Sequence, residues 1–162
     1  MVKIVIKAVN RPSGQRPDML LRWFCEAFGL SDSEDEGGIE FIILRNLTYA
    51  AYENRGYSSM ELKEHVSLGR STVVYHLNKF IESGLVVKRG RRYYLRSTDM
   101  STAIEEIEYD LNKEMMKLLD AAREFDRMME GGAVENGKGR KEKEKVKEKV
   151  TESKTLEEKK KG

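Results

Sequence analysis

Residues 58–95 decide the fold, and they read SSMELKEHVSLGRSTVVYHLNKFIESGLVVKRGRRYYL. A short helix is expected to begin after Ser58 or Ser59 and to run to about His65, because serine is a favoured N-cap residue. Only the choice of Ser58 places a glutamate, Glu61, at the third helical position, which completes a capping box. The start of the stretch therefore predicts a short, capped helix.

A second helix follows a turn that contains Gly69, and it begins at Arg70 or Ser71. Its apolar residues recur at helical spacing, which predicts one buried face. We expect Gly84 to end this helix in the left-handed conformation that glycine adopts without strain. The residues expected on the buried face are Val73, Leu77, Phe80 and Ile81.

Two β-prone runs, residues 85–88 and 91–95, surround Arg89 and Gly90. A glycine between two such runs is typical of a tight β-hairpin, with Gly90 at positive φ. Helix, turn, helix and basic hairpin together predict a winged helix-turn-helix. The fold class is therefore expected to be α+β and mainly helical, with the hairpin as the wing.

The first third of the chain adds other elements before this motif. Residues 2–9 alternate in polarity, which predicts a strand, and an apolar helix is expected from Asp18 to about Phe28 with Gly29 at its end. Residues 31–38 (SDSEDEGG) read as an acidic linker. A further helix from Ile39 to about residue 54 is expected to end at Gly56.

A long helix is predicted over residues 101–129. Its apolar residues at intervals of seven form a coiled-coil-like seam, which predicts a homodimer. We expect Gly131 and Gly132 to end this helix, and the Lys/Glu-rich remainder to be disordered because it has few apolar residues. The predicted interface residues are Ile104, Ile107, Leu111, Leu118 and Phe125.

The expected organisation has five parts: a strand–helix extension over residues 1–30, an acidic linker over 31–38, a winged helix-turn-helix over 39–98, a dimerisation helix over 99–130 and a charged tail over 131–162.

The net charge of the chain is only +2, but its distribution is uneven. Residues 58–98 carry eight Lys/Arg against three Asp/Glu, whereas residues 99–130 carry four against ten. A basic motif block is the electrostatic footprint of a nucleic-acid partner.

In a helix-turn-helix, the second helix enters the major groove and its first turns meet the base edges. Arg70 is the strongest candidate for a base-specific contact, because a guanidinium can bind guanine O6 and N7 together. The outward residues expected to face DNA are Arg70, Ser71, Thr72, Tyr75, His76 and Lys79. The wing cations expected to contact phosphate are Lys88, Arg89, Arg91 and Arg92.

Several classes of function are not expected. Cys25 is the single cysteine, so the chain forms no internal disulfide and no paired-cysteine metal site. No apolar run is long enough for a membrane span, so we expect a cytoplasmic protein. No catalytic constellation or phosphate-binding glycine loop is recognisable, so we expect neither an enzyme nor a cofactor.

The segment RSTVVYHLNKFIESGLV resembles the recognition helix of archaeal and bacterial winged-helix regulators of the ArsR-like type. The resemblance covers about residues 39–129 and implies a homodimer that binds successive major grooves. It implies that Ser71, Thr72, Tyr75 and His76 face DNA. It also implies core positions for Val73, Leu77, Phe80 and Leu85. Metal sensing is not implied, because Cys25 lies outside the matched region.

These observations predict a sequence-specific regulator of transcription that binds duplex DNA as a homodimer and acts as a repressor. The alternative is a winged helix that docks proteins of the transcription or RNA machinery through its acidic long helix. The sequence names no operator and no small-molecule effector.

Overall fold

The computed structural model describes residues 3–31 and 38–161, without the side chains of residues 133–144. The chain divides into two compact units, Met1–Leu111 and Asn112–Gly162. The protein is mainly helical, with one small antiparallel sheet, so the expected α+β class is confirmed. Nearly all of the linker predicted at residues 31–38 lies outside the described residues.

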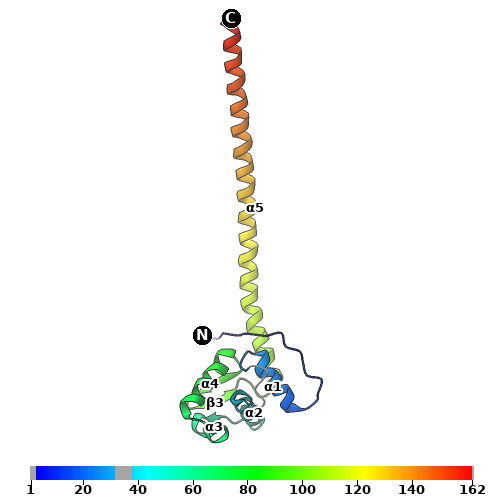
Figure 1. The fold of residues 1–162 in the computed structure, drawn as a ribbon, viewed down its shortest axis with the longest axis vertical. Coiled ribbons are helices and arrows are strands. Elements are labelled where there is room, and N and C mark those ends of the chain that lie inside the picture. The colour runs from blue at the N-terminus through cyan, green and yellow to red at the C-terminus, as the bar shows by residue number, and fades with distance from the viewer. Residues whose placement is uncertain (1–2, 32–37, 162) are drawn as a thin grey trace. The chain divides into compact units, whose positions relative to one another are not determined.

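The first unit contains four short helices, three strands and the start of a long helix (Figure 1). In chain order the elements are α1 (Pro17–Ala27), α2 (Ile39–Tyr52), β1 (Tyr57–Ser58), α3 (Ser59–Val66), α4 (Arg70–Ser83), β2 (Val86–Arg89), β3 (Arg92–Leu95) and α5 (Met100–Lys160).

The predicted ends of α3 and α4 are confirmed. Ser58 Oγ accepts from the Glu61 backbone N–H at 3.1 Å, and the Glu61 carboxylate accepts from the Ser58 backbone N–H at 2.7 Å. This is the reciprocal capping box. Gly84 ends α4 at φ 84°, in the left-handed region where a side chain would be strained.

The three strands form a sheet in the order β1-β3-β2. The predicted hairpin is confirmed: Arg89 pairs with Arg92, and Gly90 occupies the turn at φ 62°. Sequence analysis did not foresee β1, which is too short to show a strand period. Gly56 precedes it because a Cβ there would lie 2.6 Å from the carbonyl oxygen of Tyr93.

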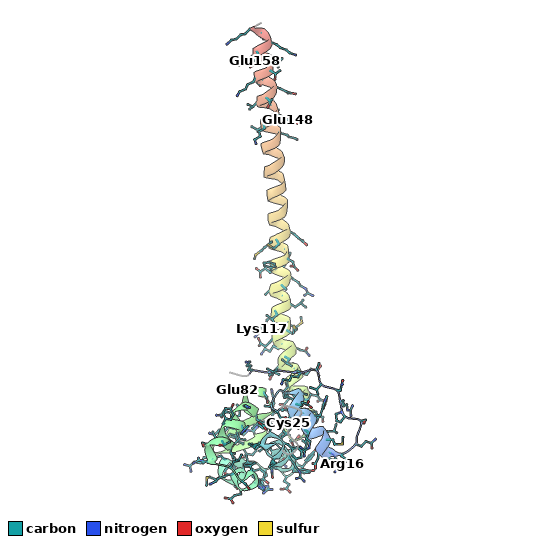
Figure 2. The ribbon with its side chains drawn as sticks, in the orientation of Figure 1. Arg16, Cys25, Glu82, Lys117, Glu148 and Glu158 are labelled. Atoms are coloured by element: carbon teal, nitrogen blue, oxygen red, sulfur yellow. The ribbon has the colours of Figure 1, made fainter. Side chains whose placement is uncertain are left out.

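The core of the first unit draws on every helix and on the sheet. Val73, Leu77 and Phe80 of α4 are fully buried, as predicted, whereas Ile81 is partly buried. Cys25 of α1 lies inside the group of helices (Figure 2). Burial raises the pKa of its thiol from 9.0 to about 12, so the thiol stays protonated.

The strand predicted over residues 2–9 is wrong for the described residues, which have no regular structure from Lys3 onward. The backbone N–H of Lys3 donates to the Glu82 carbonyl at 2.8 Å, and that of Lys7 donates to the Ala27 carbonyl at 2.7 Å. Both carbonyls lie in the last turn of a helix, where no helical N–H is available to bond them. The segment therefore bonds to helix ends instead of joining the sheet.

Helix α5 also departs from expectation, because it continues through Gly131 and Gly132 to Lys160. Each interior glycine costs a helix only about 1 kcal/mol relative to alanine, and the Lys and Glu of the tail are good helix formers. The predicted disordered tail is therefore helical in the described residues. None of the described helices combines the length and hydropathy that a membrane span requires.

Candidate nucleic-acid interface

A three-residue turn, residues 67–69, connects α3 to α4. Ser67 adopts a left-handed conformation at φ 52°, and Gly69 caps α4 without any side-chain hydrogen bond. No acidic residue lies in the first turn of α4. The amino terminus of α4 therefore keeps its partial positive charge, which favours an anion nearby.

One face of α4 is exposed along its whole length. Ser71, Tyr75 and Asn78 follow each other at intervals of four and three residues, which places them on one side of the helix. Tyr75 is 58% exposed, and the Lys79 ammonium lies 5.1 Å from the centre of its ring. Asn78 was not among the predicted DNA-facing residues, although its spacing from Tyr75 would have identified it.

Arg70 begins α4 and is exposed. Its Nε donates to Ser59 Oγ at 3.2 Å, which ties the start of α4 to the start of α3. This bond uses Nε and neither terminal amino group, so both amino groups of the guanidinium can still donate to a ligand. Thr72, beside it, is half-buried.

His76 does not lie on the exposed face. Its Nδ1 lies 2.8 Å from Oε1 of Glu40 on α2, and the two side chains are 13% and 9% exposed. The angles between the two groups do not fit a hydrogen bond. The contact is an ion pair only when the imidazole is protonated. The imidazole therefore belongs to the packing between α2 and α4, unlike the position that the resemblance implied.

The four cations of the hairpin have different environments. Arg92 is held by α3: its guanidinium donates to both carboxylate oxygens of Glu61 at 3.1 Å and to the Gly56 carbonyl at 2.7 Å. The Ser58 backbone N–H, followed by the Ser58 hydroxyl and Arg92, lowers the pKa of Glu61. Arg92 thus fixes the hairpin to α3.

Lys88, Arg89 and Arg91 are exposed, and none of them forms an ion pair within the described part of the chain. Lys88 lies 5.4 Å from the centre of the Tyr93 ring, and Arg89 lies 5.5 Å from that of Tyr94. Consecutive strand residues point to opposite faces, so these two cations serve different faces of the hairpin.

The predicted dimer residues divide between the two units. In the first unit, Ile107 is buried in the core of its own chain, and Ile104 and Leu111 pack against that core. In the second unit, Leu118 and Phe125 are exposed. They belong to an apolar stripe whose members are spaced three and four residues apart: Met115, Leu118, Ala122, Phe125 and Met129.

Helix α5 begins with a well-formed cap. Asp99 Oδ1 accepts from the Thr102 backbone N–H at 2.8 Å and from the Ser101 hydroxyl at 2.9 Å. The Thr102 backbone N–H, followed by the hydroxyls of Ser101, Thr102 and Thr98, lowers the pKa of Asp99 to about 2. Among the described residues, no group of three or more His, Cys, Asp or Glu side chains is arranged to hold a metal ion.

Comparison with known proteins finds no relative: no family model, no curated protein and no solved structure matches this chain.

Proposed function

We propose that the protein binds duplex DNA through the exposed face of α4 and the hairpin, as a winged helix-turn-helix regulator of transcription. The observation that carries this proposal is the charge of the α4–hairpin segment. Residues 70–96 hold seven Lys/Arg and one Glu, and the cations Arg70, Lys79, Lys88 and Arg91 have no ion-pair partner within the described residues. Like charges so close together favour an anionic partner such as the phosphate backbone.

The two basic elements have different roles in this proposal. α4 supplies base reading through Arg70, Ser71, Tyr75 and Asn78, because its first turns enter the major groove of DNA in this class of fold. The hairpin supplies phosphate contacts through Lys88 and Arg91. Arg92 and His76 make no DNA contact in this proposal, because Arg92 donates to Glu61 and His76 contacts Glu40.

We further propose that the functional unit is a homodimer, formed by the apolar stripe of α5 between Met115 and Met129. Spacing of three and four residues is the pattern that two helices use to bury a common seam. Large apolar side chains repeated along one exposed helix face are typical of an association surface. As a dimer, the protein would present two copies of α4 to a symmetric site, where it would block transcription.

Selection of duplexes from a random pool tests sequence reading. The full chain is expected to enrich one motif with two related half-sites, and Arg70→Gln is expected to relax one base position by about 1–3 kcal/mol. Tyr49→Phe, at an exposed position of α2 that has no role in the proposed DNA contact, is the control and should keep the wild-type motif. No enrichment by the wild-type chain would contradict the proposal.

The alternative function is protein docking through the acidic part of α5. Residues 99–130 carry ten Asp/Glu against four Lys/Arg, which favours a basic protein partner. Charge reversal of the hairpin distinguishes the two functions, and Lys88→Glu with Arg91→Glu is preferable to changing Arg92, which holds the hairpin to α3. Duplex affinity that survives this reversal favours docking, whereas its loss favours DNA binding.

A further inference from the structure

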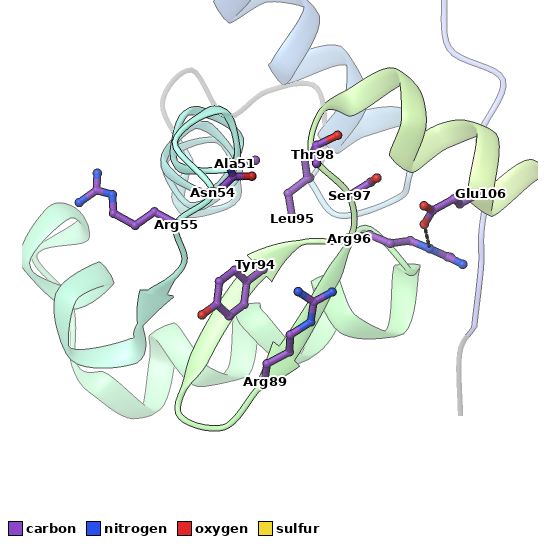
Figure 3. Close-up of a pocket in the computed structure, with 10 residues that line it drawn as sticks. All are labelled: Ala51, Asn54, Arg55, Arg89, Tyr94, Leu95, Arg96, Ser97, Thr98 and Glu106. Atoms are coloured by element: carbon purple, nitrogen blue, oxygen red, sulfur yellow. Dashed lines mark hydrogen bonds and ion pairs between the residues drawn. The ribbon is translucent and has the colours of Figure 1, made fainter.

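A cavity of about 360 Å³ lies on the outer face of the hairpin, between β2 and β3, the end of α2 and the start of α5. Figure 3 shows the residues that line it. Its size falls within the range of small-molecule sites in proteins. The cavity lies entirely within the first unit.

Three arginines line this cavity, and two of them have carboxylate partners among the described residues. Arg55 lies 2.9 Å from the Glu53 carboxylate and extends away from the other residues in Figure 3. Arg96 donates to the carboxylates of both Glu106 and Asp110. Arg89 has no carboxylate partner within the described residues, and its guanidinium points into the space below Leu95.

The neighbours of Arg89 supply further hydrogen-bonding groups. The Asn54 amide and the Ser97 hydroxyl line the cavity, and neither side chain makes a hydrogen bond within the described part of the chain. The Thr98 hydroxyl donates to Asp99 at 3.1 Å and keeps its lone pairs for an acceptor role. A guanidinium, an amide and a hydroxyl that approach from different sides suit the several oxygens of a phosphate better than a planar carboxylate.

The remaining lining is rigid and partly apolar. The Tyr94 ring packs so closely on Gly56 that a Cβ there would lie 2.7 Å from it, and Ala51 and Leu95 add apolar surface. This surface can contact the body of a ligand that is larger than phosphate alone. The polar and apolar parts together indicate a compact molecule with one phosphate group.

We propose that this cavity binds a small phosphate monoester of about nucleotide size, with Arg89 as the anion-binding residue. The site explains why Arg89 lies on the face of the hairpin opposite to Lys88 and beside an open cavity. In this proposal Arg89 is not one of the DNA contacts and binds the phosphate monoester instead. The proposal does not depend on DNA binding.

Isothermal titration of the full chain with AMP tests this site, with adenosine as the uncharged probe. AMP is expected to bind saturably, and adenosine at least about tenfold more weakly, because a charge-assisted contact is lost. Arg89→Gln should weaken AMP at least about tenfold, and Arg89→Lys should weaken it less. Arg91→Gln, in the same hairpin but outside the cavity, should bind AMP like the wild type.

The proposal is overturned by no saturable AMP binding, by equal affinities for AMP and adenosine, or by equal losses in Arg89→Gln and Arg91→Gln. A duplex titration of the same two variants separates a free ester from the DNA backbone as the source of phosphate. We expect Arg91→Gln to weaken duplex binding and Arg89→Gln to leave it nearly unchanged. If Arg89→Gln weakens duplex binding and leaves AMP binding intact, Arg89 contacts DNA and the assignment is wrong.

Discussion

Substitution of Leu118 by aspartate tests the proposed dimer. Leu118 is 65% exposed in the single chain and lies in the middle of the apolar stripe. Full burial of a leucine contributes about 1.5–3 kcal/mol, so covering this exposed part contributes about 1–2 kcal/mol per copy. Two copies contribute about 2–4 kcal/mol, which corresponds to a rise of about 30- to 700-fold in the dimer dissociation constant when the side chain is lost.

Sedimentation equilibrium of the full chain measures this constant. Leu118→Asp should shift the protein to monomer at concentrations where the wild type is a dimer, while its helix content stays the same. Met116→Asp is the matched control: Met116 is 54% exposed on the same helix, but two residues from Leu118, which is about 200° around the axis. A wild-type monomer, or equal effects of the two substitutions, would refute the reasoning.

Three further predictions concern the folded unit. Substituting His76 and Glu40 by alanine, singly and together, should give a coupling energy of about 0.5–3 kcal/mol in urea unfolding, because the two side chains are in contact and nearly buried. The single tryptophan of the chain, Trp23 on α1, reports unfolding by its fluorescence, and additive effects would show that the contact contributes nothing. Cys25 should react with a thiol reagent only after unfolding, since a pKa near 12 leaves about a thousandfold less thiolate than the usual pKa of 9.0; rapid labelling of native protein would contradict its burial. Ser58→Ala should lower the free energy of unfolding by about 1 kcal/mol through loss of the cap, and an unchanged urea midpoint would argue against the capping box.

Features of the fold that depend on neighbouring residues were predictable from the sequence. The capping box at Ser58 and Glu61, the end of α4 at Gly84 and the turn at Gly90 each follow from local backbone preferences. The buried face of α4 follows in the same way from its helical spacing. These elements are the ones that place the candidate interface.

Features that depend on distant parts of the chain were not predictable. The helical spacing of His76 from Val73 and Phe80 places it beside the buried face of α4, away from Tyr75, but its partner Glu40 on α2 is visible only in the structure. Likewise, Arg92 resembles the other hairpin cations until Glu61 is brought beside it. Such contacts between separate elements carry no local sequence signal.

The amino-terminal segment and the tail illustrate two other limits. Alternating polarity in residues 3–9 predicted a strand with one buried face, but only Ile4 and Val9 are partly buried and Ile6 is 62% exposed. The segment bonds to helix ends through its backbone N–H groups. Low apolar content in the tail indicates that it lacks a core, yet lysine and glutamate still favour a helix. Composition therefore predicted the exposure of the tail but not its helix, whereas alternation predicted neither the exposure nor the backbone conformation of residues 3–9.

The salt dependence of duplex binding tests the central claim most directly. Arg70 is assigned to a base, so three cations per chain, Lys79, Lys88 and Arg91, are available for phosphate and make six in a dimer. Neutralising about six phosphates gives a slope near −5 for log K against log salt, or a loss of about 10³ in affinity between 50 and 200 mM salt. We expect this slope in fluorescence anisotropy with a labelled duplex of about 30 base pairs. No binding at 50 mM salt, or binding that does not change with salt, would contradict the account.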